Sequence, residues 1–244
     1  MILLVDSGNT HVKWQLLSAA GLVGAGRGAL EDSALFEDLR SLGSSIRQVA
    51  VSTVGADDGV DVLCQRLARV TSAPVRCYWS ERERSGLRNS YEDVSRMGAD
   101  RWHAMLAAWC RYRCSLMVID AGTALTADYV DGRGQHLGGF IVPGLQMMRK
   151  SLNHDAARIG FQSNDTLECD PGRSTSECVN NGLNWFLRGL ILQIREDVAA
   201  HSLERIVITG GDARRLTALG LEGDVLPDLV FEGLELVVRE EAGQ

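Results

Sequence analysis

Two stretches of the sequence decide the fold class: residues 2–10 read ILLVDSGNT, and residues 116–124 read LMVIDAGTA. Each is a hydrophobic run that ends in aspartate, Asp6 in the first and Asp120 in the second. Each aspartate is followed by a small residue, a glycine, and a threonine within the next two positions. An internal repeat of this kind indicates a duplicated structural unit. The two stretches therefore predict two related halves, each built around a strand that ends in a carboxylate.

The residues after Asp6 are suited to hold phosphate. A strand that ends in aspartate places a carboxylate at the carboxyl edge of a sheet, where α/β folds bind ligands. Gly8 lets the backbone turn sharply and approach a phosphate, while Ser7, Asn9 and Thr10 offer small polar side chains and N–H groups. The loop is not of the G-x-x-x-x-G-K-[ST] kind, so alone it is equally well an ordinary turn. The similar loop after Asp120 in the second half favours two loops that face each other across a cleft and bind a triphosphate between them.

Hydrophobic periodicity extends the repeat into an α/β pattern. In the first half the predicted strands are 2–6, 11–17, 21–30, 47–54 and 75–79, with helices over 31–42, 57–70 and Ala99–Arg113. In the second half the predicted strands are 115–120, 124–130, 136–142 and 205–209. Helices are expected from Pro143, over 174–201, after Asp212 and over 228–240. The irregular segment 153–172 is expected to be a mobile or partner-facing loop.

Composition narrows the class of protein. The chain has 244 residues, a net charge of −7 and a pI of about 5.3, so it lacks the basic surface of a nucleic-acid-binding protein. An anionic ligand must then be held by local groups such as backbone N–H, a lysine or a metal ion. No apolar run approaches the ~18 residues that span a bilayer, so no membrane segment is expected.

The six cysteines point to a reducing compartment. They are scattered, form no C-x-x-C pair and have no histidine at ligand spacing. Reduced cysteines in a cytoplasmic protein are therefore expected. His103 and His136 are isolated and show no ligand pattern, and the residues around His103 are typical of a helix core.

An ordered set of motifs resembles one enzyme family. The motifs are D-S-G-N-T-x-x-K at 6–13, N-x-Y at 89–91, G-A-D-R at 98–101, D-A-G-T-A at 120–124, G-G-x-I-x-P-G at 138–144, Thr175 with Glu177, and T-G-G-D at 209–212. The chain resembles type III pantothenate kinase, a bacterial enzyme of the actin, hexokinase and acetate-kinase superfamily. The resemblance covers nearly the full chain.

The resemblance implies both a fold and an activity. The fold is α/β, with duplicated ribonuclease-H-like lobes at 1–113 and 114–244 and a nucleotide cleft between them. The activity is phosphorylation of pantothenate by ATP to 4′-phosphopantothenate, the first step of coenzyme A biosynthesis. The enzyme is expected to be a homodimer that needs Mg²⁺ and a monovalent cation, K⁺ or NH₄⁺.

The resemblance also implies roles for the nucleotide-side residues. Asp6 organises Mg²⁺ through water, and the turn Ser7, Gly8, Asn9 and Thr10 approaches the phosphates. Lys13 acts as a point charge on phosphate; the alternative is a solvated strand lysine. In the second half, Asp120 holds the monovalent cation, Thr123 touches ATP, and adenine lies against Gly210 and Gly211. A helix-entry turn is the alternative for the two glycines.

On the substrate side, Asp100 is expected to be the catalytic base. The substrate site implied by the resemblance is Tyr91, Gly98, Ala99, Asp100, Arg101 and Thr175. Each has a structural alternative: Asp100 as a helix cap or first-turn residue, Arg101 as an exposed helix arginine, Tyr91 as a packing residue and Thr175 as a cap.

Two other function classes stay open. The first is a catalytically silent regulatory or transcriptional accessory protein, since the same family contains members first described in that way. The second is a phosphatase or a chaperone-like ATPase on the same superfamily fold. The intact set Asp6, Lys13, Asp100, Arg101 and Asp120 favours the kinase, because a purely regulatory protein has no reason to keep a base.

Overall fold

The computed structural model describes residues 1–8, 10–53, 57–155 and 159–243. Asn9, one of the predicted phosphate-turn residues, lies outside these ranges. Within them the chain forms two compact units, residues 1–111 with 228–244, and residues 112–227. No helix in the described ranges is both long enough and apolar enough to cross a membrane.

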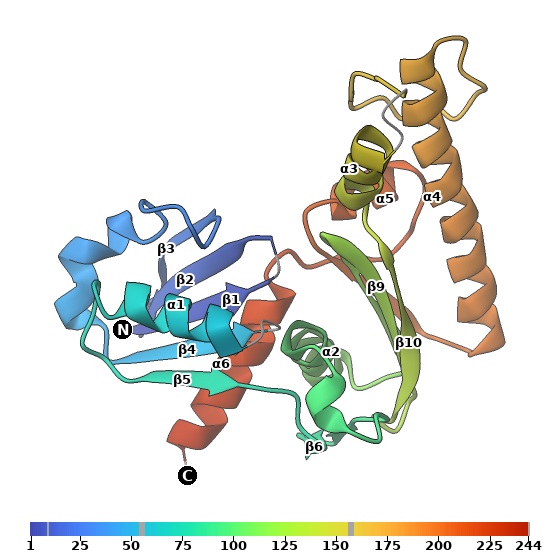
Figure 1. Cartoon of the computed structure of the whole chain (residues 1–244). Helices are drawn as coiled ribbons and strands as arrows, with labels where there is room; N and C mark the ends of the chain where they lie inside the picture. The colour runs from blue at the N-terminus through green and yellow to red at the C-terminus, as the bar shows by residue number, and fades with distance from the viewer. Residues whose placement is uncertain (9, 54–56, 156–158, 244) are drawn as a thin grey trace. The chain divides into compact units, whose positions relative to one another are not determined.

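The first unit is built on a five-stranded sheet with the order β3-β2-β1-β4-β5 (Figure 1). Its strands are β1 (Ile2–Ser7), β2 (Val12–Ser18), β3 (Gly21–Gly28), β4 (Gln48–Thr53) and β5 (Val75–Tyr78). The central strand β1 pairs antiparallel with β2 and parallel with β4. The α/β prediction is therefore confirmed for this half.

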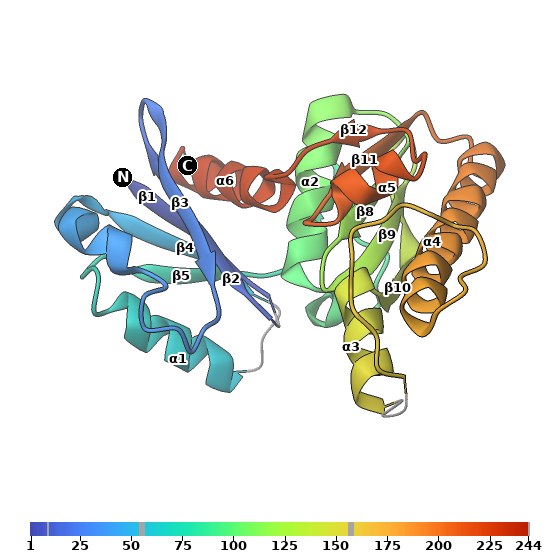
Figure 2. The ribbon, with the colours of Figure 1, turned by 90° about the horizontal axis from the view of Figure 1, so that it is seen from above.

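The two faces of this sheet are covered by different elements. One face packs against α1 (Asp57–Leu67) and the 3-10 helix η1 (Glu37–Ser45) through a cluster that includes Leu3, Val5 and Leu63. The other face is covered by α6 (Leu229–Ala242), which contacts β1 and β4. Figure 2 shows α1 and α6 on opposite sides of the sheet.

The predicted α-helix over 31–42 is wrong, because this stretch forms turns followed by η1. Its apolar residues Leu35, Phe36 and Leu39 are nevertheless buried, as the periodicity indicated. Asp32 accounts for the difference at the start of the stretch. Its Oδ1 accepts a hydrogen bond from Ala34 N at 2.9 Å, a local bond that competes with helix formation.

The chain then reaches α2 (Ala99–Tyr112) through short elements. The stretch 81–92 contains a small hairpin, β6 (Glu83–Arg84) with β7 (Leu87–Arg88), and η2 (Val94–Arg96) follows it. Most of α2 is buried on all sides, which is the environment of a core helix.

The second unit repeats the plan of the first. Its sheet has the order β10-β9-β8-β11-β12, and the central strand β8 pairs antiparallel with β9 and parallel with β11. The strands are β8 (Leu116–Ala121), β9 (Ala124–Val130), β10 (His136–Pro143), β11 (Arg205–Thr209) and β12 (Asp224–Val225). β1 and β8, the strands that end in Asp6 and Asp120, thus occupy the same position in the two sheets. The predicted duplication is confirmed.

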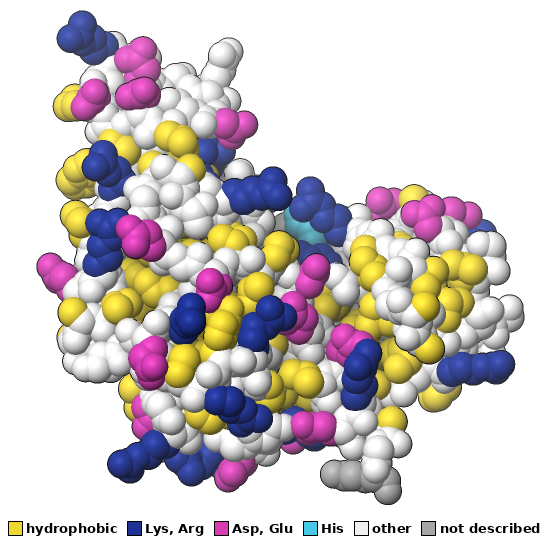
Figure 3. Space-filling model, turned by 180° about the vertical axis from the view of Figure 1, so that it is seen from behind, with side chains coloured by type: hydrophobic (Ala, Val, Ile, Leu, Met, Phe, Trp, Pro, Cys, Tyr) yellow, Lys and Arg dark blue, Asp and Glu magenta, His cyan; other side chains and the backbone are white. Residues whose placement is uncertain are grey.

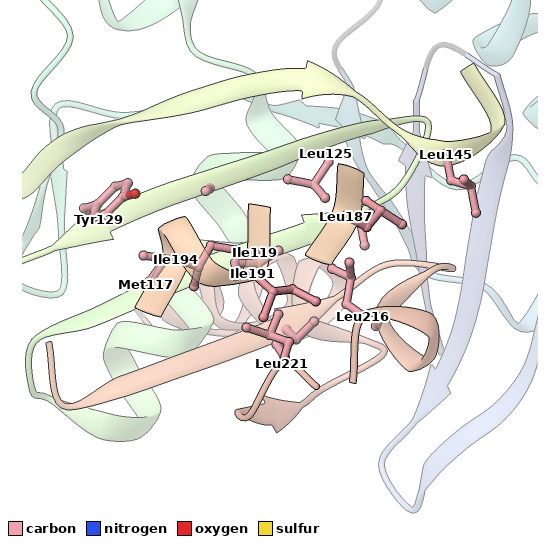
Figure 4. Packing of buried hydrophobic residues seen from close by; sticks show 14 of the residues in the cluster. Met117, Ile119, Leu125, Tyr129, Leu145, Leu187, Ile191, Ile194, Leu216 and Leu221 are labelled. Atoms are coloured by element: carbon pink, nitrogen blue, oxygen red, sulfur yellow. The ribbon is translucent and has the colours of Figure 1, made fainter. Parts of the chain in front are cut away.

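Three helices belong to this unit: α3 (Leu145–Asp155), α4 (Thr175–Ala200) and α5 (Ala213–Ala218). Pro143, expected at a helix start, is the last residue of β10, and α3 begins two residues later. Figure 4 shows Leu187 and Ile191 of α4 packed with Ile119 and Leu125 of the sheet, within one buried cluster. This packing fixes α4 on the sheet that carries Asp120.

The compact units differ from the expected lobes, 1–113 and 114–244, at the end of the chain. Residues 228–244 belong to the first unit and not to the second. The reason is packing: Leu234, Val237 and Val238 of α6 are buried, and α6 lies on β1 and β4. A Cβ at Gly233 would overlap the carbonyl of His103, so α6 and α2 are in close contact there.

Candidate active site

The first unit places Asp6 in a row of polar side chains at the end of its sheet. Asp6 is 8% exposed and lies between Lys13 on β2 and Ser52 on β4, its partners in the strand register. Register partners point to the same face of a sheet, so the three side chains are neighbours. Lys13 Nζ lies 3.9 Å from Asp6 Oδ2. Lys13 alternates along β2 with the buried Val12 and Trp14, so it lies on the opposite face, beside the carboxylate.

The turn after β1 is tight, as predicted. Gly8 N donates to His11 O at 3.2 Å, which closes the turn between β1 and β2. Ser7 is buried and pairs in register with Thr53, so β1 and β4 both end in a hydroxyl residue. Ser52 and Thr53 were missed by the sequence reasoning. Their signal is a pair of small hydroxyl residues near the end of the predicted strand at 47–54.

The G-A-D-R segment begins α2 and is held from outside the helix. Ser80 Oγ donates to the carbonyls of Met97 at 3.0 Å and Gly98 at 3.3 Å. Asp100 is half-buried in the first turn, and its Oδ1 accepts from Arg101 N at 2.7 Å. A carboxylate there also stabilises the helix N-terminus, so Asp100 is placed as its structural alternative, a first-turn residue, requires.

Tyr91 and Arg101 are brought together. Arg101 Nη1 donates to the Tyr91 hydroxyl at 2.9 Å, and the guanidinium lies 5.7 Å from the centre of the phenol ring. Arg101 is only 6% exposed, so its alternative reading as an exposed helix arginine is wrong. Asn89 Oδ1 accepts from Tyr91 N at 3.0 Å and orders the loop before α2.

In the second unit, three loops converge on the D-A-G-T segment. Gly144 N donates to Thr123 O at 3.0 Å, and Asp212 N donates to Ala121 O at 2.9 Å. A Cβ at Gly144 would overlap the carbonyls of Gly122 and Thr123, and a Cβ at Gly210 would overlap Asp120 and Ala121. The predicted residues Asp120, Thr123, Gly210 and Gly211 are therefore brought together.

Gly144 and Asp212 complete this loop cluster and had no predicted role. Gly144 is the last residue of the G-G-x-I-x-P-G motif, and Asp212 ends T-G-G-D, so the motifs were the available signal. Burial raises the pKa of the Asp212 carboxyl, while the guanidinium groups of Arg215 and Arg149 act in the opposite direction. The cluster thus holds a carboxyl whose charge is sensitive to its surroundings.

Thr175 begins α4, but it is not the cap. Ser174 occupies the N-cap position, and its Oγ accepts from Glu177 N at 3.2 Å. Glu177 Oε2 accepts from Arg173 N at 2.6 Å, so the two side chains complete a capping box. The alternative reading of Thr175 as a cap is wrong. Its side chain lines a surface pocket of about 700 Å³, a size that suits a small molecule.

This pocket lies entirely on the second unit. Its lining residues are Leu152, Ile159, Gly172, Arg173, Ser174, Thr175, Cys178, Val179, Gly182 and Leu183. The other predicted substrate residues, Tyr91 and Gly98–Arg101, belong to the first unit. The predicted substrate set is thus divided between the units.

The irregular segment before α4, residues 159–174, is anchored by side chains. The buried Asn184 donates through Nδ2 to Thr166 O and Glu168 O, both at 2.8 Å. The buried Asn180 donates to Gln162 O at 2.9 Å. Arg149 Nη2 donates to Asn164 O at 2.7 Å. Of the predicted irregular stretch 153–172, residues 159–172 have irregular backbone, whereas 153–155 instead end α3. The hydrogen bonds show how the irregular backbone is satisfied.

The described residues hold no group of three or more His, Cys, Asp or Glu side chains arranged to bind a metal ion. Mg²⁺ in nucleotide enzymes is usually held by one or two carboxylates, water and substrate phosphates. Asp6, a single carboxylate near the end of β1, fits that pattern.

Comparison with known proteins gives a consistent family. The family model described as type III pantothenate kinase matches residues 2–197. A protein of that name from Marinobacter nauticus is 50% identical over 237 residues, covering 97% of this chain and 98% of the relative. A second, from Cellvibrio japonicus, is 36% identical over 249 residues and covers 100% of this chain and 99% of the relative.

Solved structures agree on the fold. A Baf family protein from Campylobacter jejuni superposes with a TM-score of 0.63 at 19% identity, covering 99% of this chain and 100% of the other. A proposed 2-dehydro-3-deoxygalactonokinase from Sinorhizobium meliloti gives a TM-score of 0.62 at 15% identity, covering 99% of both chains. At these identities the likeness concerns the fold alone, and it matches the duplicated α/β plan described above.

Proposed function

The chain belongs to the type III pantothenate kinase family, and from this membership we propose that it transfers the γ-phosphoryl group of ATP to the hydroxyl of pantothenate. The product is 4′-phosphopantothenate, and the reaction is the first step of coenzyme A biosynthesis. The observation that carries the proposal is the set of side chains that the first unit brings together. It combines a phosphate-side carboxylate and lysine, Asp6 and Lys13, with a half-buried acid, Asp100, and a buried Arg101.

Asp100 is assigned the role of base. Phosphoryl transfer passes through a loose transition state, so orientation of the hydroxyl and stabilisation of charge supply most of the catalysis. A carboxylate on the first turn of α2 is held rigidly by a helix that is otherwise buried. It accepts the proton of the substrate hydroxyl as the new P–O bond forms, and the bond from the γ-phosphorus to the bridging oxygen of ADP breaks.

Arg101, Tyr91 and Thr175 are assigned to pantothenate. A guanidinium binds a carboxylate through two parallel hydrogen bonds, and pantothenate carries one carboxylate. The Tyr91 hydroxyl accepts a hydrogen bond from Arg101, which holds the guanidinium in one orientation. Thr175 supplies a hydroxyl at the start of α4.

Asp6 is assigned to Mg²⁺ through water, with Lys13 on the phosphates. The ion, when bound, neutralises charge that develops on the phosphoryl oxygens. Lys13 contributes a mobile positive charge on a half-exposed side chain, 3.9 Å from Asp6. Ser7, Gly8, Asn9 and Thr10 are assigned to close approach of the backbone to the phosphates.

The loop cluster of the second unit is assigned to the nucleotide and the monovalent cation. Asp120 offers a carboxylate, and the loop around it offers carbonyl oxygens, which are the hard ligands that K⁺ and NH₄⁺ prefer. Thr123 is assigned to ATP. Gly210 and Gly211 present backbone without side chains, which suits a flat adenine ring.

The test of this function is a direct assay. Purified protein with pantothenate, ATP, Mg²⁺ and K⁺ is expected to form 4′-phosphopantothenate and ADP in equal amounts, measured by mass spectrometry. Replacing K⁺ with Na⁺ is expected to suppress turnover. A folded protein that gives no product above background would refute the kinase, whereas indifference to the cation would refute only the Asp120 assignment.

We infer that the active form is a homodimer in which the second unit supplies the contact. That unit exposes large apolar side chains on β10 and α4, namely Phe140, Ile141, Trp185 and Leu192. Trp185 is 69% exposed. Figure 3 shows apolar side chains among the charged ones along the arm at the left, which contains α4. Exposed aromatic groups of this kind mark protein contacts.

Light scattering coupled to size exclusion tests the dimer. The wild-type chain is expected to elute at twice its 26.6 kDa mass, and Trp185→Glu is expected to shift it toward the monomer. Val62→Glu, on an exposed apolar position of α1, serves as the control and leaves the mass unchanged. A wild-type monomer at working concentration would refute the dimer.

The regulatory alternative gains no support. The relatives named above are described as kinases. The Campylobacter jejuni structure is described as a proposed transcriptional activator, but it shares only 19% of its sequence with this chain. A cytoplasmic location stays a prediction from the cysteine pattern.

A further inference from the structure

His103 is a buried polar residue to which neither the sequence motifs nor the proposed mechanism assigns a role. It is 0% exposed and lies on α2, three residues after Asp100. Its Nδ1 lies 2.9 Å from Ser52 Oγ, within hydrogen-bond distance. Ser52 is also completely buried. A buried polar contact between a helix and a strand is costly to form, so it is kept where it fixes geometry.

Ser52, the strand residue that contacts His103, lies beside Asp6 on the phosphate side of the proposed site. Ser52 is the register partner of Asp6, and both side chains lie on the face of the sheet that α6 covers. Asp6 in turn neighbours Lys13. The first unit therefore contains one continuous row, Lys13, Asp6, Ser52 and His103.

The helix that carries His103, α2, also carries Asp100 on the substrate side of the proposed site. Residues three apart on a helix lie on the same face, one turn from each other. Asp100 thus sits one turn N-terminal to the contact with Ser52. The last two turns of α2 are packed by apolar residues, whereas His103, one turn after Asp100, joins the helix to β4 by this polar contact.

We propose that His103 is a positioning residue, which through Ser52 fixes the first turn of α2, and with it Asp100, relative to the strand ends that carry Asp6. The inference rests on the proposed function, because it assigns His103 to the placement of that base. A displacement of about 1 Å in a reacting group can cost roughly 100-fold in rate. A rigid link between the two strand ends and the base therefore has kinetic value beyond its contribution to folding.

The imidazole is suited to this task because it stays neutral. Burial, and secondarily the nearby charge of Arg84, lower the pKa of His103 to about 3. Its other ring nitrogen, Nε2, has no hydrogen-bond partner among the described residues. Among the described residues, Ser52 is therefore the hydrogen-bond partner that fixes the orientation of the ring.

The experiment compares variants that keep or remove this bond. His103→Leu and Ser52→Ala remove it, whereas His103→Asn places an amide near the position of Nδ1 and keeps it. We expect kcat to fall about 10-fold or more in the first two, within the range for a misplaced catalytic group. KM for ATP is expected to change less than about 3-fold, and His103→Asn is expected to restore kcat to within about 3-fold of wild type.

His136→Leu is the matched control. His136 is also buried, and its Nε2 lies 3.1 Å from Asp128 Oδ1 in the second unit. This variant is expected to lower the melting temperature without lowering kcat. If it lowers kcat as much as His103→Leu does, the effect is general destabilisation and the proposal is wrong.

A second readout does not depend on kinase activity. Hydrogen–deuterium exchange in Ser52→Ala is expected to rise in the peptide over 98–104 and to stay unchanged over 105–112. Unchanged exchange over 98–104 would overturn the proposal even if turnover fell. A wild-type protein without pantothenate kinase activity would instead refute the proposed function, while the exchange experiment would still decide whether His103 holds the helix turn.

Discussion

Gly210 packs directly against Asp120, so the strand-ending carboxylate of the second unit lies against bare backbone. Gly210 has φ of +91°, and any Cβ there would overlap Asp120 Oδ1 and the carbonyl of Ala121. Both constraints require glycine at this position. Its neighbour Gly211 has no heavy atom within 4 Å of a built Cβ.

Gly210→Ala is therefore expected to affect stability, and Gly211→Ala is expected to affect ATP binding. Gly210→Ala should lower the free energy of unfolding by about 1–3 kcal/mol, because it adds left-handed backbone strain and a clash. Gly211→Ala should leave stability unchanged and raise KM for ATP, if adenine lies on that backbone. Urea unfolding and steady-state kinetics measure the two effects. Equal stability losses would contradict this assignment.

Asp100→Asn is expected to keep ATP binding and to lose about 10²–10⁴-fold in kcat, the range for removal of a general base. The amide preserves the size of the side chain, so folding should be retained. Glu235→Gln, which alters an exposed ion pair with Arg239 on α6, is the control for loss of one negative charge. Turnover at the wild-type rate in Asp100→Asn would remove this residue from the mechanism.

Tyr91→Phe removes the acceptor of the Arg101 hydrogen bond. A bond to a charged donor contributes about 1.5–3 kcal/mol, so KM for pantothenate is expected to rise about 10-fold or more while KM for ATP stays constant. Tyr78→Phe is the matched control, since Tyr78 lies in the same unit and its hydroxyl bonds to Gln48 and Glu241. A parallel rise in both KM values would argue for general distortion.

The low pKa of His103 predicts an acid-sensitive stability. An unfolded histidine takes up a proton near pH 6.5, whereas the buried ring does so only near pH 3. The unfolded chain therefore binds more protons between these values, so the contribution to stability is complete above pH 6.5 and is lost as the pH falls toward 3.

Urea unfolding at pH 7.5 and pH 5.0 measures this loss. Wild type should lose about 2 kcal/mol more than His103→Asn over that interval, since each pH unit within the window contributes about 1.4 kcal/mol. Asparagine does not titrate, so the difference isolates His103 from other groups. Identical losses in the two proteins would show that the ring is protonated in the folded state.

Asn184→Ala is expected to lower the free energy of unfolding by about 2–4 kcal/mol. In the segment 159–174, the change removes one donor from the carbonyls of Thr166 and Glu168, of which Thr166 O keeps its bond from Arg215 Nη2. It also removes an acceptor from Arg215, whose Nη2 lies 2.6 Å from Asn184 Oδ1. Asn181→Ala is the control: Asn181 is half-buried, and its Nδ2 donates to the carbonyl of Asp170 at 2.9 Å, so its removal should cost less than about 1 kcal/mol. Equal losses would mean that Asn184 does not anchor the segment.

Much of the fold was predictable because its signals are local. β1 and β8 are continuous hydrophobic runs, and the alternation of Val12, Lys13 and Trp14 gave the correct faces of β2. The missed features depend on tertiary context. The stretch 31–42 shows helical spacing, yet the side chain of Asp32 closes a turn inside it.

The same contrast holds for the candidate site. The Asp6 and Asp120 loops repeat a short motif and could be found by comparing the two halves of the sequence. Ser52 and His103 could not, because their importance comes from one contact between residues that are 51 positions apart. Burial of Arg101 likewise depends on how the loop before α2 packs, and an isolated helix position does not reveal it.

Helix α6 is the last element of the chain, yet it completes the first sheet. During synthesis on the ribosome, residues 1–111 emerge long before residues 228–244, so the face of the sheet that carries Leu4 and Ala50 lacks its contact with α6 while the second unit is being made. The second unit, in contrast, is contiguous and is complete as soon as residue 227 has emerged. The first unit thus begins to emerge before the second, but it can finish folding only after the second is complete.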